Sequence, residues 1–192
     1  MLMADRASFE LAMRLRGPGG AAIGDVFSFM SGLYFRGKLA YARAFARPPD
    51  VESPLAADGI LVITPTAGLR PPETRVTREA LRAFAGADVS LDNPLYRKPL
   101  EASARALRDE AGPDCDVVLL GSVASGKYVD ILAEMFGDRL LFPADFVGRG
   151  DMSRGGLMLR CASSGEELRY VPVAGAVRHG PRPPRLTPLR GG

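Results

Sequence analysis

Two short apolar segments constrain the fold of this chain more than any other feature: GILVIT at 59–64 and CDVVLL at 115–120. Both are rich in Ile, Val and Leu and only six residues long, which is typical of strands buried on both faces. Each runs into a loop that contains glycine and then into a segment with helical periodicity. Because buried strands that alternate with helices are typical of layered α/β proteins, we predict a single three-layer α/β domain with a mostly parallel central sheet.

Three further segments complete this prediction. RLLF at 139–142 predicts another strand, and the apolar segments 156–162 and 168–173 flank a polar turn. Two apolar segments joined in this way predict an antiparallel β-hairpin, which we place at the edge of the sheet. The chain is then divided into an N-terminal helix and arm (1–23), the α/β domain (24–175) and a basic, flexible Pro/Arg/Gly tail (176–192).

Helices are predicted from apolar spacing and from capping residues. Residues 24–46 carry apolar side chains at helical spacing, and Gly32 or Gly37 divides them into two helices. Thr77 and Asn93 are suited to cap the helices that follow them. The aromatic residues of the first segment are expected to pack in the core: Phe27, Phe29, Tyr34, Phe35, Tyr41 and Phe45.

The composition excludes several classes of protein. Two cysteines and one histidine, His179, are too few for a structural zinc site, and they make Ser-His-Asp and Cys-His mechanisms improbable. Asp5 and Glu10 interrupt the start of the chain, and no stretch has the roughly 20 apolar residues that span a bilayer. We therefore expect a cytoplasmic protein with reduced thiols, no metal, no cofactor and no membrane partner.

The positive charge is concentrated at the C-terminal end. After Glu167 there are five arginines and no acidic residue, so residues 1–167 hold 20 basic and 22 acidic side chains, a net charge of −2. A basic tail of this kind contacts phosphates in some proteins and only solubilises others. Nucleic acid is thus one partner that the tail allows.

The strongest local motif is GSVASGK at 121–127, between the second apolar segment and a helix. Gly121, Gly126 and Lys127 satisfy the spacing G-x-x-x-x-G-K, in which backbone amides, a helix N-terminus and a lysine surround an anion. Ser122 and Ser125 supply hydroxyl donors for the same oxygens. The alternative is a plain glycine-containing turn with its lysine in solvent.

The motif departs from that of nucleotide triphosphatases at its last position. Tyr128 stands where those enzymes have the Ser or Thr that holds magnesium, and its hydroxyl lies too far from the loop for this role. We expect anion binding at this loop, without a metal.

A second segment with functional chemistry is VGRGDMSRGG at 147–156, which we interpret as a loop. Arg149 and Arg154 can bind phosphate or carboxylate, Ser153 can donate to the same group, and Asp151 can orient an arginine or position water. The alternative is an exposed loop in which Asp151 pairs with an arginine.

A third such segment is the loop after the first strand, with Thr64, Thr66 and Arg70 as polar groups. Ligands of open α/β sheets bind at the carboxyl ends of strands. If the two apolar strands are parallel neighbours, this loop and residues 121–127 face one crevice.

The order of these segments resembles a group of uncharacterised bacterial and phage domains, over residues 30–160. The residues that carry the resemblance are Leu33, Tyr34, Tyr41, Ala42, Gly68, Leu69, Pro72, Gly121 and Tyr128. Those domains are distantly similar to the uracil-DNA-glycosylase-like α/β fold, which implies a nucleobase or nucleotide as ligand. The His-Pro-Ser loop of such glycosylases is missing here, so the resemblance does not carry base-excision activity.

Two functional hypotheses remain open. In the first, the three loops bind a nucleotide-like or phosphorylated ligand, with Lys127 and Asp151 as catalytic residues if an N-glycosidic or phosphoester bond is hydrolysed or transferred. In the second, the protein is a non-catalytic interaction domain that contacts nucleic acid or another protein through its tail and the Gly/Arg segment.

Overall fold

About half of the described residues are helical, and the strands between the helices form three small sheets. The computed structural model describes residues 2–4, 6–53, 55, 57–124, 126–177, 180–184 and 186. The helices are α1 (Glu10–Arg16), α2 (Ile23–Phe45), α3 (Arg78–Gly86), α4 (Pro94–Ala111), α5 (Gly126–Phe136) and α6 (Asp151–Ser164), with 3-10 turns η1 (Gly137–Arg139) and η2 (Ala144–Phe146). The strands are β1 (Ala21–Ala22), β2 (Val62–Thr64), β3 (Gly68–Arg70), β4 (Arg75–Val76), β5 (Val117–Val118), β6 (Leu140–Pro143) and β7 (Tyr170–Pro172).

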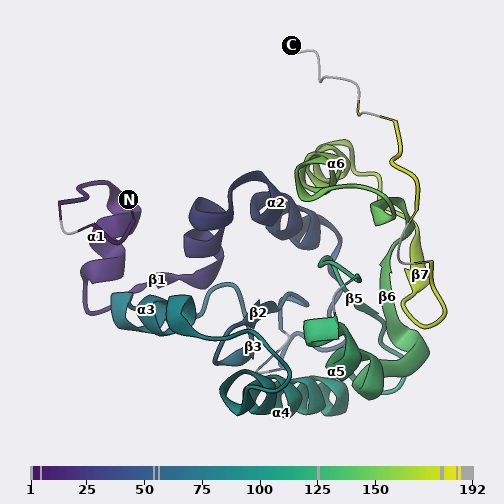
Figure 1. Cartoon of the computed structure of the whole chain (residues 1–192), viewed down its shortest axis with the longest axis horizontal. Coiled ribbons are helices and arrows are strands. Elements are labelled where there is room, and N and C mark those ends of the chain that lie inside the picture. The colour runs from purple at the N-terminus through teal and green to yellow at the C-terminus, as the bar shows by residue number, and fades with distance from the viewer. Residues whose placement is uncertain are drawn as a thin grey trace.

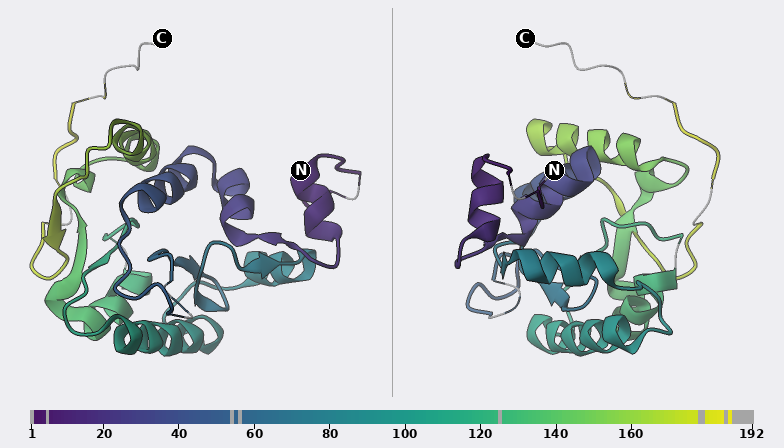
Figure 2. Two further views of the ribbon diagram at one scale, coloured as in Figure 1. Left: turned by 180° about the vertical axis from the view of Figure 1, so that it is seen from behind. Right: turned by 60° about the vertical axis from the view of Figure 1, so that its left-hand side comes forward.

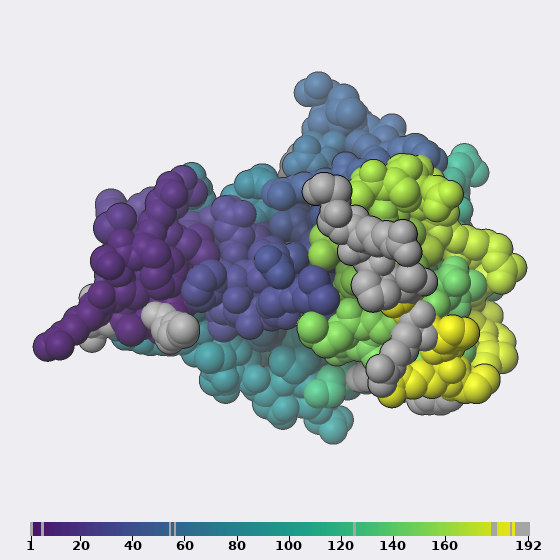
Figure 3. Space-filling model, turned by 90° about the horizontal axis from the view of Figure 1, so that it is seen from above, coloured from purple at the N-terminus to yellow at the C-terminus, as the bar shows by residue number. Residues whose placement is uncertain are grey.

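These elements are arranged in a ring. Going round it, α2 is followed by α6, the β5–β6–β7 sheet, α5, α4 and the β2–β3 hairpin (Figure 1). The view from behind shows the same arrangement (Figure 2). The N-terminal segment with α1 forms one end of the molecule, and α6 and β7 lie at the other end (Figure 3). Residues far apart in the sequence therefore face one another across the centre.

The predicted central sheet is wrong. β1 pairs with β4 and β2 pairs with β3, both antiparallel, and only β5 and β6 form a parallel pair, with β7 antiparallel at the edge. The reason is length: two or three residues of each apolar segment form ladder bonds, and β2 turns straight back into β3. The remaining residues of both segments lie outside any strand, so the three-layer arrangement does not form.

The predicted C-terminal hairpin is also wrong in its first half. Residues 151–164 form α6, so that the segment read as a Gly/Arg loop and a strand is one helix. Met158 and Cys161 are buried at helical spacing, and Gly165 ends the helix with φ 73° in the left-handed region. The second half is confirmed as β7, which pairs with β6 at the edge of the three-stranded sheet.

The two glycines of α2 have different roles. Gly32 has φ 61° and ψ −138°, which interrupts the helix and confirms a division within residues 24–46. Gly37 lies against Gly155 of α6: a Cβ added to Gly37 would approach the Gly155 carbonyl oxygen to 2.6 Å. This contact of two glycines lets α2 and α6 cross at backbone distance, as small residues do in other close helix pairs.

The helix starts are as predicted. The Thr77 side chain accepts a hydrogen bond from the Ala80 amide, and the Asn93 side chain accepts one from the Leu95 amide, with Pro94 in the first turn. In α4 the helix runs on through Pro99 to Ala111.

The described apolar side chains form two clusters. The larger one joins α4, α5, β6 and α6, with Leu100, Leu140 and Met158 fully buried, and the smaller one surrounds Leu15 and Val26 near the N-terminus. Of the six aromatic residues expected in the core, Tyr41 is buried and four are half-buried. Phe29 is 47% exposed and stacks on Phe9.

Within the part of the chain that the structure describes, no helix is long and apolar enough to cross a membrane.

Candidate functional site

The centre of the ring holds a cavity of about 1260 Å³. Its wall is formed by the second half of α2, the β2–β3 hairpin, α4, residues 113–121 and α5. Aromatic side chains from four different elements line it: Phe35, Tyr41, Phe45, Tyr96, Tyr128 and Tyr170. Ligand sites in proteins are usually concave and mostly apolar with a few polar groups, and this cavity has that character.

Lys38 is a basic side chain in this mostly apolar wall. It extends from α2, and its Nζ atom lies 3.9 Å from the centre of the Tyr34 ring, one helical turn earlier. Among the described residues it has no carboxylate within ion-pair distance. Burial lowers the pKa of Lys38 to about 8, with Arg154 adding to this effect and Asp151 opposing it.

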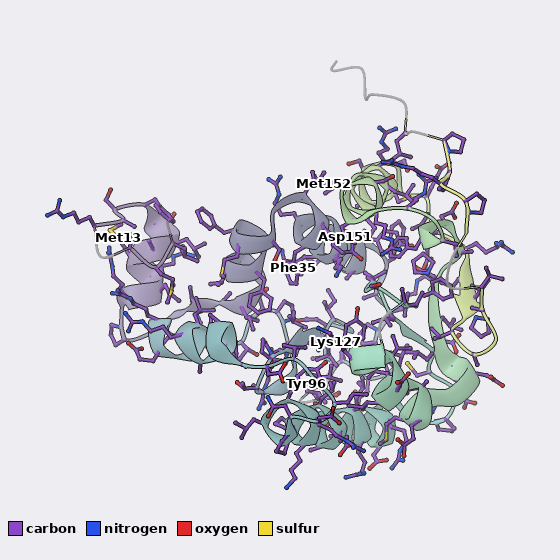
Figure 4. All side chains as sticks on the ribbon, viewed as in Figure 1. Met13, Phe35, Tyr96, Lys127, Asp151 and Met152 are labelled. Atoms are coloured by element: carbon purple, nitrogen blue, oxygen red, sulfur yellow. The ribbon has the colours of Figure 1, made fainter. Side chains whose placement is uncertain are left out.

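The crossing of α2 and α6 explains why the charged side chains of Lys38, Asp151 and Arg154 lie near one another. Gly37 and Gly155 are in contact; Lys38 directly follows Gly37 in α2, and Arg154 directly precedes Gly155 in α6. We call Lys38, Asp151 and Arg154 the charged cluster. Figure 4 shows Asp151 at the start of α6, beside the second half of α2. The sequence separates these groups by more than 110 positions, and the glycine contact brings them together.

The guanidinium of Arg154 contacts other groups of the protein. Its Nε and Nη2 atoms donate to the Phe146 carbonyl oxygen at 3.2 and 3.1 Å, and Nη1 lies 3.5 Å from Asp151 Oδ1. The side chain of Arg154 is 12% exposed and that of Asp151 is 65% exposed. The guanidinium is therefore held in place as a fixed charge, while the carboxylate remains open to water.

Two tyrosines connect this cluster to the loop after β5. Tyr34 Oη donates to the Leu120 carbonyl oxygen at 3.4 Å, and Tyr128 Oη donates to the Ser122 carbonyl oxygen at 2.9 Å. Burial raises the pKa of Tyr34 to about 12 and also raises the pKa of Tyr128. Both hydroxyls consequently stay protonated at neutral pH.

Tyr128 also fills the turn at 121–127. A Cβ added to Gly121 would meet Tyr128 Oη at 2.7 Å, so this glycine makes room for the tyrosine hydroxyl. Gly126 begins α5 and Lys127 is exposed beside it, across the ring from Asp151 (Figure 4). Ser122 is half-buried, and Ser125 lies outside the described residues. Anion binding at this loop stays a prediction.

The other predicted polar groups of residues 147–156 make internal contacts. Arg149 donates from Nε to the Asp145 carbonyl oxygen at 2.9 Å and from Nη1 to Ser153 Oγ at 3.3 Å. Both residues lie two positions from Asp151 in the sequence. The residues that line the cavity include none of Arg149, Asp151, Ser153 and Arg154.

The loop after β2 reaches the cavity by a different route from the one expected. β2 and β5 belong to different sheets, so they are not parallel neighbours. Thr64 and Gly121 nevertheless both line the cavity. Thr64 Oγ1 donates to the Gly68 carbonyl oxygen at 2.8 Å and accepts from the Ala67 amide at 2.9 Å, which closes the β2–β3 turn. Thr66 is half-buried and Arg70 is exposed.

A chain of hydrogen bonds lies at another part of the wall. Tyr170 Oη donates to Glu167 Oε1 at 2.9 Å, and Tyr41 Oη lies 2.6 Å from Tyr170 Oη. Because the Tyr170 proton points to the carboxylate, Tyr41 must donate to Tyr170, while it accepts from the Leu168 amide at 2.9 Å. This chain ties the segment before β7 to α2.

Tyr96 differs from Tyr41 in that its hydroxyl is buried without a hydrogen-bond partner among the described residues. Removing an unpaired buried hydroxyl costs little, whereas removing a paired one leaves its partners unsatisfied. We expect Tyr96→Phe to leave the free energy of unfolding unchanged or to raise it by up to about 1 kcal/mol. Tyr41→Phe should lower it by about 1–2 kcal/mol. Urea denaturation of both variants measures the difference, and an equal loss in the two would contradict it.

Sequence reasoning missed Lys38 as a site residue. The chain contains three lysines, at 38, 98 and 127, so the residue type alone gave no reason to prefer Lys38. Its position in the sequence could have indicated a role: Lys38 directly follows Gly37 and lies on the apolar face of a predicted helix. A charged residue at such a position is unusual enough to be a candidate for function.

The tail hypothesis rests largely on residues that the structure does not describe. Arg178, His179, Arg185 and Arg190 lie outside the described residues, so contact with nucleic acid through the tail stays a prediction. Among the residues that are described, no three His, Cys, Asp or Glu side chains come together as a metal site. Cys115 and Cys161 are free thiols.

Comparison of the chain with protein-family models, with curated proteins and with solved structures gives no match. The resemblance to the glycosylase-like fold therefore stays an expectation.

Proposed function

We propose that the protein binds a small molecule whose aromatic or otherwise apolar body occupies the central cavity and whose polar group, an oxyanion or a carbonyl, contacts Lys38. The observation that carries this proposal is the half-buried lysine Lys38 in a mostly apolar wall, with no carboxylate in ion-pair distance among the described residues. A partly desolvated cation without a counter-ion costs free energy, and a ligand oxygen would offset that cost.

The size and lining of the cavity support this class of ligand. Binding sites for small molecules commonly measure about 300–1,000 Å³. The cavity of about 1260 Å³ is larger still, so a molecule of nucleotide size can be accommodated. A nucleotide-like ligand belongs to the proposed class, because its base is aromatic and its phosphate is an oxyanion.

Arg154 and two tyrosines also lie near Lys38, and Arg154 adds to the proposal. The Arg154 guanidinium is fixed by the Phe146 carbonyl, so it supplies positive potential near Lys38 without having to be ordered on binding. Tyr34 and Tyr128 keep their protons at neutral pH and lie between α2 and the loop after β5. Their protons are donated to the Leu120 and Ser122 carbonyl oxygens, so the positive charge near this side of the cavity comes from Lys38 and Arg154.

The fluorescent probe 1-anilinonaphthalene-8-sulfonate tests this proposal, because it combines an aromatic body with one anionic group. We expect one probe molecule to bind per chain, and Lys38→Met to weaken its affinity roughly tenfold, the loss expected for one hydrogen bond to a charged group. The affinity of the unaltered protein should fall as the pH rises through about 8, because Lys38 then loses its charge. Fluorescence and calorimetric titrations measure both effects.

Two variants serve as controls. Lys98→Met removes an exposed lysine of α4, and Phe29→Ser removes an exposed ring outside the cavity; neither should change the affinity. If Lys38→Met binds the probe as tightly as Lys98→Met does, the site is elsewhere. A loss of binding in Phe29→Ser would place the probe on the exposed aromatic surface instead.

A further inference from the structure

We infer that Lys38 is a nucleophile whose amine condenses with the carbonyl group of an aldehyde or ketone held in the cavity, forming an imine. The inference rests on the proposed function and narrows it, since it names the reactive group of the ligand.

The first support is the surroundings of the amine. Lys38 extends along the cavity wall, and its Nζ atom lies over the face of the Tyr34 ring rather than against a carboxylate. An ion pair would keep the nitrogen protonated and its lone pair unavailable. Desolvation is one of the usual ways in which a lysine becomes reactive toward carbonyl compounds; here it outweighs the opposing charge of Asp151, and Arg154 adds a smaller effect in the same direction.

The second support is the geometry of the wall. The apolar side chains that line the cavity provide space for the body of a carbonyl compound directly beside Lys38. Other lysines lack this setting: Lys98 and Lys127 are exposed, and neither lines the cavity.

The chemical step balances without any other reactant. The Lys38 nitrogen forms a bond to the carbonyl carbon while the C–O π bond opens, which gives a carbinolamine. The oxygen then leaves as water with both of the amine protons, and the C=N bond of the imine forms. No oxidant or reductant is needed.

The titratable and charged groups around Lys38 set the pH at which this happens. They are Tyr34 on α2, Asp151 and Arg154 on α6, and Tyr128 on α5 across the cavity. Burial lowers the pKa of Lys38 to about 8, and both tyrosines stay protonated in this range. The neutral, reactive amine is therefore well populated slightly above neutral pH, where an ordinary lysine is almost wholly charged.

Reductive trapping with benzaldehyde and sodium cyanoborohydride tests the inference on the full chain. Benzaldehyde is small and aromatic, and the reductant converts an imine into a stable benzylated lysine that peptide mass spectrometry locates. Because the chain has three lysines, the peptide that carries the label identifies the modified residue directly. At pH 7.5 we expect Lys38 to be benzylated at least about tenfold faster than Lys98, with a rate that rises through pH 8 and saturates with benzaldehyde.

The N-terminal amine is an internal reference, because its ordinary pKa is also close to 8. Faster labelling of Lys38 than of this amine, slowed by 1-anilinonaphthalene-8-sulfonate, supports an imine formed in the cavity. Labelling of all amines at similar rates overturns the inference. If the sulfonate probe binds in a Lys38-dependent way and Lys38 is still not trapped, the imine fails while the proposed function stands. If probe binding does not depend on Lys38 and Lys38 is not trapped, both the imine and the proposed function are wrong.

Discussion

Gly155→Ala is expected to destabilise the protein by about 3 kcal/mol, although it adds a single methyl group. A Cβ at this position would lie 2.8 Å from the Leu33 carbonyl oxygen and 2.9 Å from Tyr34 Cα, which are backbone atoms of the facing helix. A flexible side chain could move aside, but the α2 backbone cannot do so without shifting the whole crossing. For a chain of this length the loss corresponds to a decrease in Tm of roughly 6–12 °C.

Gly156→Ala is the matched control for this prediction. It lies next in the same helix, and an added Cβ would meet only Leu186 Cδ1, at an ordinary contact distance of 3.7 Å. Alanine is a better helix former than glycine, so this variant should gain about 0.5–1 kcal/mol. Thermal and urea denaturation measure both variants, and equal stabilities would mean that α2 and α6 do not cross as closely as the structure has them.

Gly155→Ala also has a consequence for the candidate site. Because Gly155 sets the distance between α2 and α6, moving the helices apart separates Arg154 and Asp151 from Lys38. The fraction of Gly155→Ala that remains folded should therefore bind the sulfonate probe more weakly, whereas Gly156→Ala should bind it normally.

Gly68→Ala is expected to have the other large effect, a loss of about 4 kcal/mol or failure to fold. Gly68 has φ 69°, which costs an L-residue about 1–2 kcal/mol. An added Cβ would also collide with the Pro99 carbonyl oxygen and Ser103 Oγ of α4. Ser103 Oγ accepts the Leu69 amide at 2.8 Å, so relieving the collision breaks a hydrogen bond that joins the hairpin to the helix.

Gly165→Ala separates backbone strain from collision. Gly165 also has a positive φ, 73°, but no atom lies within 4 Å of an added Cβ. This variant should lose only about 1–2 kcal/mol. Urea denaturation compares the free energies of unfolding of Gly68→Ala and Gly165→Ala. If Gly68→Ala does not fold, the yields of folded protein on expression are compared instead. A Gly68→Ala loss no larger than that of Gly165→Ala would show that the hairpin does not press on α4.

Local structure was largely predictable from the sequence by itself. The Thr77 and Asn93 caps, the break in α2 at Gly32 and the strand at 139–142 are set by neighbouring residues through turn geometry, capping and apolar spacing. Even the error at α6 was local, because Leu157, Met158 and Cys161 fit a helical as well as a strand pattern when the glycines at 155 and 156 are read as loop residues.

What only the tertiary structure decided is which elements lie side by side. A buried strand of two or three residues does not encode its partner, so three small sheets formed where one was expected. The approach of Arg154 and Asp151 to Lys38 depends on the contact of Gly37 with Gly155, more than 110 residues apart in the chain. Such contacts arise from the mutual packing of whole helices, and no local pattern in the sequence specifies them.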